Sequence, residues 1–212
     1  MSNLIYIADP MCSWCYGFGP ELTRLLEGLP ETPLDIVVGG LRANHRETMT
    51  PTLKATLLSH WQRVQEASGL PFRDEGISRD GFIYDSEPAC RAVVAARMLA
   101  PDASLATFLA IQEAFYAGGQ DVTRGEVLAN VAADAISKAG FPVDAATFQA
   151  TWASEAAIVA TDADFEQTKR WGVSGFPTLV LQRGEKLDLV CAGYVKTEFL
   201  VEQLQALIDN PA

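Results

Sequence analysis

The stretch DPMCSWCYGFGP at residues 9–20 places two cysteines, Cys12 and Cys15, on either side of a two-residue spacer. An apolar, β-rich run at residues 4–8 stops immediately before it at an Asp-Pro pair, a pattern typical of a buried strand that ends in a turn. After it, leucines recur at helical spacing: Leu22, Leu25, Leu26 and Leu29. The cysteine pair is therefore predicted to lie between a strand and the start of a helix.

This position gives the first cysteine a distinct chemistry. Unpaired N–H groups and the helix dipole favour an anion at a helix N-terminus by about 0.3 to 1 kcal/mol, which favours the thiolate form of Cys12. Cys15 lies about one helical turn further on, near enough to attack a mixed disulfide on Cys12 and release the bound partner. The pair is therefore predicted to be catalytic, with Cys12 as the more exposed nucleophile and Cys15 as the more buried resolving thiol.

The neighbours of the two cysteines are expected to modify this chemistry. Ser13 and Trp14 carry no charge and are predicted to tune the redox potential of the pair. Trp14 either packs on the helix surface or contacts substrate. Asp9, three residues before Cys12, is expected to hold the Asp-Pro turn, and the alternative is a carboxylate that acts on the nearby thiol.

Two cysteines with this spacing can also hold a metal ion. A zinc site needs two further ligands at a suitable spacing, but Cys90 and Cys191 are isolated and His45 and His60 have no short-range partner. Neither a metal nor a cofactor is therefore predicted. Free cysteines are among the most buried residue types, so Cys90 and Cys191 are expected in the core, and a second redox pair formed by them is left open.

The rest of the chain alternates between mixed and helical patterns. A second strand is predicted at residues 34–38, closed by Gly39-Gly40, which completes a βαβ unit. From about residue 42 to about 151 the pattern is helical. Its predicted helices begin after Ser86, span residues 105–115, and follow a capping box at residues 123–126. The last third predicts a helix at residues 155–171, a hairpin of residues 178–182 and 186–191, and a final helix through Leu200, Leu204, Leu207 and Ile208. The predicted fold class is α/β.

Charge and composition exclude several kinds of partner. The chain has 212 residues and a formal net charge of −11, which repels nucleic-acid phosphates and anionic lipid surfaces. No Lys/Arg cluster is evident that would reverse this charge locally. The N-terminus resembles no secretory signal, and no window approaches the ~18 apolar residues of a membrane span. A cytoplasmic protein with no nucleic-acid partner and no membrane partner is therefore expected.

Two distant motifs together resemble a known family. A strand, a Cys-x-x-Cys motif and a helix are followed by GVSGFPTLVL at residues 172–181, a hairpin and a last helix. This order resembles the thioredoxin fold with an inserted all-helical domain, as in the DsbA-like thiol:disulfide oxidoreductases. DPMCSWCYGFGP, and YAGGQDVTRGEVL at residues 116–128, are similar to the cytosolic FrnE-like branch. The resemblance implies a thioredoxin-like domain at residues 1–41 and 152–212 and a helical insertion at residues 42–151.

The resemblance also implies roles for single residues. Cys12 matches the nucleophile and Cys15 the resolving cysteine of the family. Pro177 matches the proline that takes the cis form opposite the disulfide, which would turn the backbone of Phe176 toward the active site to pair with an extended peptide. Tyr16 and Phe176 are predicted to be substrate-facing aromatic residues.

Three functions remain open at this point. The leading hypothesis is a thiol:disulfide oxidoreductase that acts on protein or low-molecular-weight thiols and disulfides, glutathione among them, with the direction of electron flow undetermined. Ser13 and Trp14 differ from the Pro and His of the periplasmic members, so strong oxidising activity and a membrane partner are not expected. The alternatives are a glutathione-dependent isomerase or transferase of the same fold and a non-catalytic binding module. The oligomeric state is not predicted.

Overall fold

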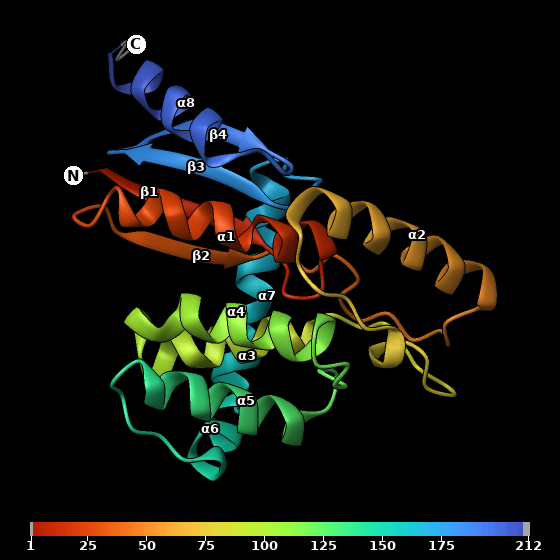
Figure 1. Cartoon of the computed structure of the whole chain (residues 1–212). Coiled ribbons are helices and arrows are strands. Elements are labelled where there is room, and N and C mark those ends of the chain that lie inside the picture. The colour runs from red at the N-terminus through yellow and green to blue at the C-terminus, as the bar shows by residue number, and fades with distance from the viewer. Residues whose placement is uncertain (1, 210–212) are drawn as a thin grey trace.

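A four-stranded sheet with helices around it organises the structure, a computed structural model that describes residues 2–209 (Figure 1). The first unit is β1 (Ser2–Ala8), α1 (Ser13–Glu27) and β2 (Leu34–Val38). The helices that follow are α2 (Pro51–Ser68), α3 (Glu87–Leu99), α4 (Ser104–Tyr116), α5 (Gly125–Lys138), α6 (Ala145–Trp152) and α7 (Glu155–Arg170). The chain ends with β3 (Thr178–Arg183), β4 (Lys186–Ala192) and α8 (Thr197–Asp209). The predicted α/β class and the order of the elements are confirmed.

The strand order is β2-β1-β3-β4, with β1 parallel to β2 and antiparallel to β3. Side chains of β1 alternate between the two faces of the sheet, as strand geometry requires. Leu4 and Tyr6 join the main buried cluster, whereas Ile5 and Ile7 join a smaller cluster with Val180 on the opposite face. α1 and α8 pack together on the face of the main cluster, so the start of α1 is held directly beyond the end of β1.

The free edge of β2 is closed by side chains from two helices. Asp164 of α7 accepts a hydrogen bond from the backbone N–H of Val38 at 3.0 Å, and Arg97 of α3 donates to the carbonyl of Ile36 at 2.6 Å. Arg97 and Asp164 also form an ion pair with a nitrogen–oxygen distance of 2.9 Å. Unpaired backbone groups on an edge strand favour pairing with another chain, so this ion pair protects the edge.

The inserted helices form two parts. α2 packs against α1 and projects to the right in Figure 1, while α3, α4, α5 and α6 form a bundle below the sheet. One buried hydrophobic cluster runs from the sheet into these helices. The division into residues 1–41 with 152–212 and residues 42–151 stays a prediction, and the hydrophobic packing is continuous across it. No helix described between residues 2 and 209 is long and apolar enough to cross a bilayer.

Two predicted helix caps differ from the structure. The capping box at residues 123–126 is wrong, because α5 begins at Gly125 after an N-cap at Arg124 without a side-chain cap, and the Thr123 hydroxyl instead donates to Asp121 at 2.6 Å. Ser86 does precede α3, but its hydroxyl does not cap that helix. The Ser86 hydroxyl instead donates a hydrogen bond to Asp9, in the candidate site described below.

Candidate active site

The two cysteines lie at the start of α1. Cys12 is the N-cap residue, with φ −91° and ψ 117°, and its N–H donates to the carbonyl of Asp9 at 3.0 Å. Cys12 is 6% exposed and Cys15 is fully buried, so of the two residues only Cys12 reaches solvent. Cys90 and Cys191 are also buried, as expected, and all four cysteines are free thiols.

The loop before β3 brings a distant backbone carbonyl to Cys12. The peptide bond between Phe176 and Pro177 is cis, as the resemblance implied. The Cys12 Sγ lies 3.6 Å from the carbonyl oxygen of Phe176, a contact that joins residues 164 positions apart. The ring of Phe176 lies over Gly39, where a Cβ atom would be 2.1 Å from Cζ of the ring. Glycine at position 39 thus leaves the room that this loop conformation needs.

The residues between and after the cysteines face different neighbours. Trp14 is partly buried, and its ring centroid lies 5.7 Å from that of Tyr194 in the loop between β4 and α8. Tyr16 is buried at the seam with the insertion, where its ring stacks on Tyr116 at 4.9 Å. Burial, and then the charge of Glu113, raise the pKa of Tyr16 to about 12. Tyr16 lines a cavity of about 550 Å³ that extends along α1 away from Cys12, and its role in substrate contact remains a prediction.

Burial dominates the electrostatics behind the sulfur atoms. It raises the pKa of the Cys15 thiol well above its usual range, and the neighbouring Cys12 raises it further. Burial also raises the pKa of Tyr6, followed by smaller contributions from Cys15 and Cys12, which puts the Tyr6 hydroxyl beside the resolving position. At neutral pH Cys15 is therefore a protonated thiol in an apolar environment.

Asp9 is fully buried and organises the region behind the pair. Its Oδ1 accepts from the N–H of Met11 at 2.7 Å, which is the turn contact that the sequence predicted. Its Oδ2 accepts three further hydrogen bonds, from the N–H of Leu41 at 2.6 Å, the hydroxyl of Ser86 at 2.7 Å and the thiol of Cys90 at 3.4 Å. Burial raises the pKa of Asp9, and the hydrogen bonds partly offset this rise.

Sequence reasoning did not connect Arg42 or His45 of the insertion to Cys12. The hydroxyl of Tyr84 donates to the carbonyl of Met11 and lies 3.5 Å from the hydroxyl of Tyr116. The guanidinium of Arg42 lies over the Tyr84 ring, 5.6 Å from its centroid, and its Nη2 lies 3.2 Å from Nε2 of His45. The only local signal was two basic residues and a histidine within five positions, and nothing in it connects this loop to Cys12.

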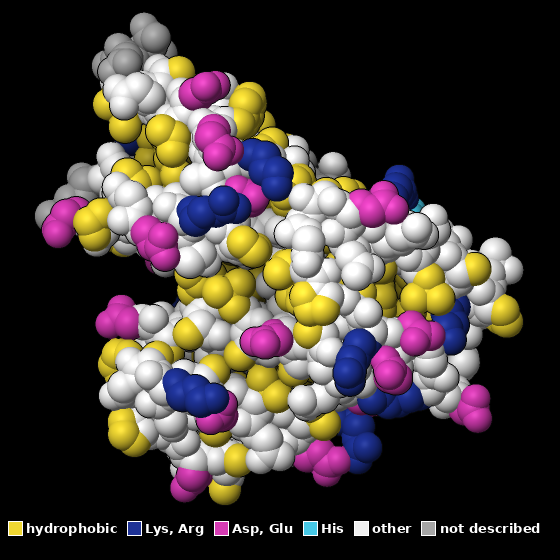
Figure 2. All heavy atoms as spheres, viewed as in Figure 1, with side chains coloured by type: hydrophobic (Ala, Val, Ile, Leu, Met, Phe, Trp, Pro, Cys, Tyr) yellow, Lys and Arg dark blue, Asp and Glu magenta, His cyan; other side chains and the backbone are white. Residues whose placement is uncertain are grey.

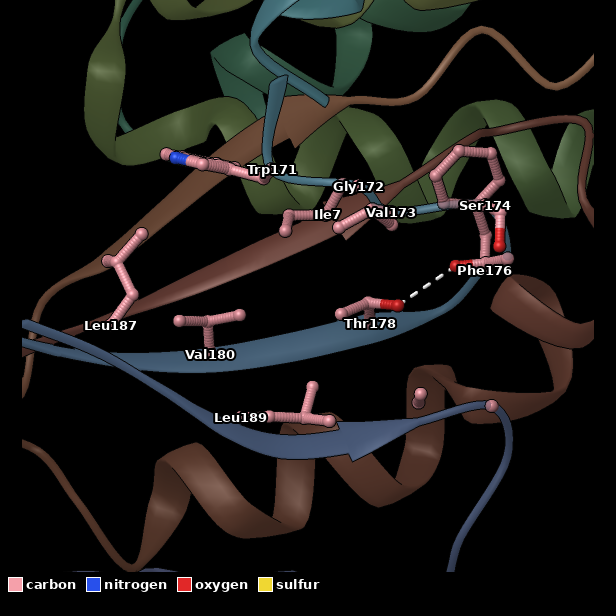
Figure 3. A pocket seen from close by; sticks show the side chains of 13 residues that line it. Ile7, Trp171, Gly172, Val173, Ser174, Phe176, Thr178, Val180, Leu187 and Leu189 are labelled. Carbon is pink, nitrogen blue, oxygen red and sulfur yellow. Dashed lines mark hydrogen bonds between the residues drawn. The ribbon is translucent and has the colours of Figure 1, made fainter. Parts of the chain in front are cut away.

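A separate cavity of about 590 Å³ lies on the face of the sheet opposite α1 and α8 (Figure 3). Ile7, Val180, Leu187 and Leu189 line its floor, and Phe176 borders one end. No cysteine lines it. Among residues 2–209 no group of three or more His, Cys, Asp or Glu side chains is placed to hold a metal ion.

Comparisons with known proteins identify the family and the fold. The family model described as a DSBA-like thioredoxin domain matches residues 4–205. The chain is similar to a candidate protein disulfide isomerase from Nitrosomonas europaea, with 35% identity, 98% of each chain covered and a TM-score of 0.87. It is also similar to the cytosolic disulfide reductase DsbM from Pseudomonas aeruginosa, with 25% identity, 98% of this chain and 100% of that chain covered, and a TM-score of 0.77.

A curated relative is longer than this chain. The ClpXP adapter protein SpxH from Halalkalibacterium halodurans is 28% identical over 177 residues, which are 81% of this chain and 56% of that protein. The chain thus spans little more than half the length of this relative.

Proposed function

The chain belongs to the family of DSBA-like thioredoxin domains, and on this premise we propose that it exchanges disulfides with thiol substrates through Cys12 and Cys15. Its enzyme class is thiol:disulfide oxidoreductase, with the direction of electron flow open. The observation that carries the assignment to these two residues is their arrangement. Cys12 has a path to solvent and lies against the Phe176 carbonyl, and Cys15 is buried behind it.

The reaction proceeds in two exchange steps. The thiolate of Cys12 attacks one sulfur of a substrate disulfide, so that a Cys12–substrate disulfide forms, the substrate disulfide breaks and the leaving thiolate takes a proton from water. Cys15 then loses its proton and attacks the Sγ of Cys12, which releases the second substrate thiol. Two electrons have passed from the cysteine pair to the substrate, and the reverse sequence oxidises a substrate dithiol.

The different environments of the two sulfurs support this order. Cys15 is fully buried, and burial raises the pKa of its thiol, so it does not compete with Cys12 for a substrate in solution. Cys15 reacts only after the mixed disulfide has formed, because the sulfur that it then attacks, on Cys12, lies about one helical turn away. A buried resolving thiol therefore limits the unproductive reactions of the pair.

Protein substrates are proposed to bind along the backbone of Phe176. Its N–H makes no hydrogen bond with any of residues 2–209, and its carbonyl accepts only the long contact from Cys12. A free N–H and a weakly engaged C=O on one residue can pair with an extended peptide as a short added strand. Such pairing tolerates many side chains, so protein disulfides and low-molecular-weight disulfides, glutathione among them, are both proposed substrates.

The direction of electron flow and the cellular location of the protein are two separate proposals. A cytoplasmic location and a reducing role are supported by the similarity to DsbM, which is described as a cytosolic disulfide reductase. The reduction potential of the Cys12–Cys15 couple decides the direction, because a difference of ~30 mV from the cytosolic poise corresponds to ~1.4 kcal/mol. A potential clearly above that poise would favour oxidation or isomerisation.

Trapping of the mixed disulfide tests the proposed function. In a Cys15→Ser variant the second step is blocked, so covalent adducts through Cys12 should accumulate with a disulfide substrate and disappear on reduction. Intact-mass analysis measures them, and Cys12→Ser is the matched control that should form none. No adduct with any protein or small disulfide would refute the proposal. Full activity of the double Cys→Ser variant on a small molecule would instead favour the glutathione-dependent isomerase or transferase.

A further inference from the structure

Three basic side chains lie in the loop that follows β2, whose first residues are hydrogen-bonded to Asp9 and Ser86. Arg42 and His45 are partly buried, and Arg46 is exposed. None of them forms an ion pair with a carboxylate among residues 2–209. The protein as a whole carries a net charge of −11, and acidic side chains are spread over the face shown in Figure 2. Basic groups without a carboxylate partner, in a loop bonded to the turn that carries Cys12, are unusual in such a protein and require a reason.

The fold holds this loop firmly against the active site. The N–H of Leu41 donates to Asp9 at 2.6 Å, and the N–H of Arg42 donates to the hydroxyl of Ser86 at 3.1 Å. Ser86 in turn donates to Asp9, three residues before Cys12. Three hydrogen bonds therefore fix the start of the loop relative to the turn that carries the nucleophile.

Tyr84 links the guanidinium of Arg42 to the turn that carries Cys12. Its hydroxyl is bonded to the carbonyl of Met11, directly before Cys12, and Arg42 lies over its ring at 5.6 Å from the centroid. Burial mainly raises the pKa of Tyr84, and among the smaller effects Cys12 raises it while Arg42 lowers it. The hydroxyl of Tyr84 thus interacts electrostatically with both Cys12 and Arg42.

The donors of Arg42 are only partly used. Nη2 lies 3.2 Å from Nε2 of His45, and Nε is buried with no hydrogen-bond partner among the described residues. A guanidinium has five N–H donors in a rigid fork that matches a carboxylate, and charge-assisted bonds of this kind are stronger than neutral ones. A buried donor without a partner costs free energy that a bound carboxylate would recover.

We propose that Arg42 and His45 form a carboxylate-binding subsite for low-molecular-weight disulfides that carry carboxylates. The proposal rests on the proposed function and names a substrate class for it. The carboxylate binds at Arg42 while one sulfur of the disulfide meets Cys12. A tripeptide-sized thiol spans roughly 10 Å, and Tyr84 lies between the two ends, with its hydroxyl on the residue before Cys12 and its ring under Arg42. Because the protein as a whole has a net charge of −11, this local positive charge selects among small disulfides.

The chemical step is the exchange already described. The disulfide takes up two electrons and two protons and becomes two thiols, while the reduced cysteine pair becomes a disulfide. The pre-reduced protein itself supplies the electrons in a single turnover, so the test requires no other reductant.

Single-turnover kinetics with three disulfides test the subsite. Oxidised glutathione carries carboxylates, hydroxyethyl disulfide is uncharged, and cystamine carries only ammonium groups. With Arg42→Ala the rate constant for oxidised glutathione should fall about tenfold or more, and that for hydroxyethyl disulfide should change less than about twofold. His45→Gln should lower the glutathione rate by a smaller factor, and Arg42→Lys should restore part of it. Arg63→Ala, which removes the same charge from an exposed position on α2, is the matched control.

Two measurements keep the test decisive if a variant fails to fold. In the unaltered protein, added salt should slow the reaction with oxidised glutathione more than that with hydroxyethyl disulfide. The ratio of alkylation rates of Cys12 by anionic iodoacetate and by neutral iodoacetamide should also fall in Arg42→Ala. Equal loss with all three disulfides would show a merely structural role and overturn the subsite. Turnover of hydroxyethyl disulfide without any preference for glutathione would refute the subsite alone, and no turnover of any disulfide would refute the proposed function itself.

Discussion

Ser86 donates its hydroxyl hydrogen to Asp9 across 77 residues, with Oγ 2.7 Å from Oδ2. This bond joins the start of α3, in the helical insertion, to the turn that leads from β1 to Cys12. Asp9 also accepts from Leu41 at the other end of the βαβ unit. A single buried carboxylate therefore connects the three segments that surround the nucleophile, so its removal should affect the whole protein.

Asp9→Ala should lower the free energy of unfolding by about 3 kcal/mol, because several buried donors lose their acceptor and each such loss costs about 1 to 3 kcal/mol. Urea unfolding followed by circular dichroism measures the change. Asp144→Ala removes an exposed N-cap carboxylate of α6 and should cost only about 1 kcal/mol. Equal losses in the two variants would contradict the central role of Asp9.

The pH dependence of the Asp9 contribution follows from burial, which raises the pKa of this carboxyl in the folded state. Its contribution is therefore fully present below the pKa of the unfolded chain and is lost as pH rises through the folded-state pKa. The stability difference between the unaltered protein and Asp9→Asn, which does not titrate there, should shrink as pH rises from 4 to 8. Unfolding curves at several pH values measure it, and a difference that grows with pH would refute the shift.

The contribution of Glu21 to stability should change with pH in the opposite direction to that of Asp9. It is 3% exposed and accepts from the hydroxyl and the N–H of Thr197 at 2.6 and 2.9 Å and from Lys196 at 3.2 Å, which ties α1 to the start of α8. Burial alone would raise its pKa, but these bonds lower it overall. Its contribution is present above the unfolded-state pKa and is lost as pH falls through the folded-state value.

Glu21→Gln should therefore lower the free energy of unfolding by about 2 kcal/mol at neutral pH and by less in acid. Chemical unfolding at pH 7 and at pH 3 provides the comparison. Glu166→Gln, which removes an exposed carboxylate paired only with Lys169, is the control and should change stability little. A loss in Glu21→Gln that is the same at both pH values would show that the charge of Glu21 contributes nothing.

Iodoacetamide should modify Cys12 of the reduced, folded protein roughly tenfold or more faster than the other thiols. Burial raises the pKa of Cys15 and Cys90 well above the usual range and that of Cys191 to about 11, so these thiols are both protonated and shielded at neutral pH. Peptide mass spectrometry over time measures the order of labelling. In urea all four should react at similar rates, and labelling of Cys15 as fast as Cys12 in the folded protein would contradict the assigned order.

Gly39→Ala should slow disulfide exchange several-fold. The new Cβ atom would lie 2.1 Å from Cζ of Phe176, so the ring must move, and we expect the displacement to reach the carbonyl of the same residue, which faces Cys12. Single-turnover rates with hydroxyethyl disulfide measure the effect. Gly28→Ala, where the nearest atom is 3.4 Å away, is the control, and equal rates for Gly39→Ala and the unaltered protein would show that the position of Phe176 is not needed.

Local patterns in the sequence were sufficient for most of the fold. The second strand was predicted at its observed bounds, and the helix at residues 155–171 ended within one residue of α7. These elements have strong periodicity, which depends only on near neighbours. The capping box at residues 123–126 failed because Thr123 found a closer acceptor in Asp121, a competition that a cap motif does not encode.

The residues of the candidate site also divide into those that local sequence predicted and those that it did not. The spacing of Cys12 and Cys15 and their position after a strand predicted the pair itself, since both are local features. The arrangement of Phe176 opposite Cys12 followed only from the resemblance to a known fold. The links from Asp9 to Leu41 and Ser86 had no signal at all.

The sequence by itself thus determined the order of strands and helices, the cysteine pair at a helix start and the acidic character of the surface. Only the tertiary structure decided that the Phe176 carbonyl lies 3.6 Å from the Cys12 Sγ, that Asp9 joins Leu41 and Ser86, and that Arg42 lies over the ring of Tyr84. The physical reason is distance along the chain. These contacts join residues 32 to 164 positions apart, and they form only where packed layers bring the ends of β1, β2 and β3 and the start of α3 together.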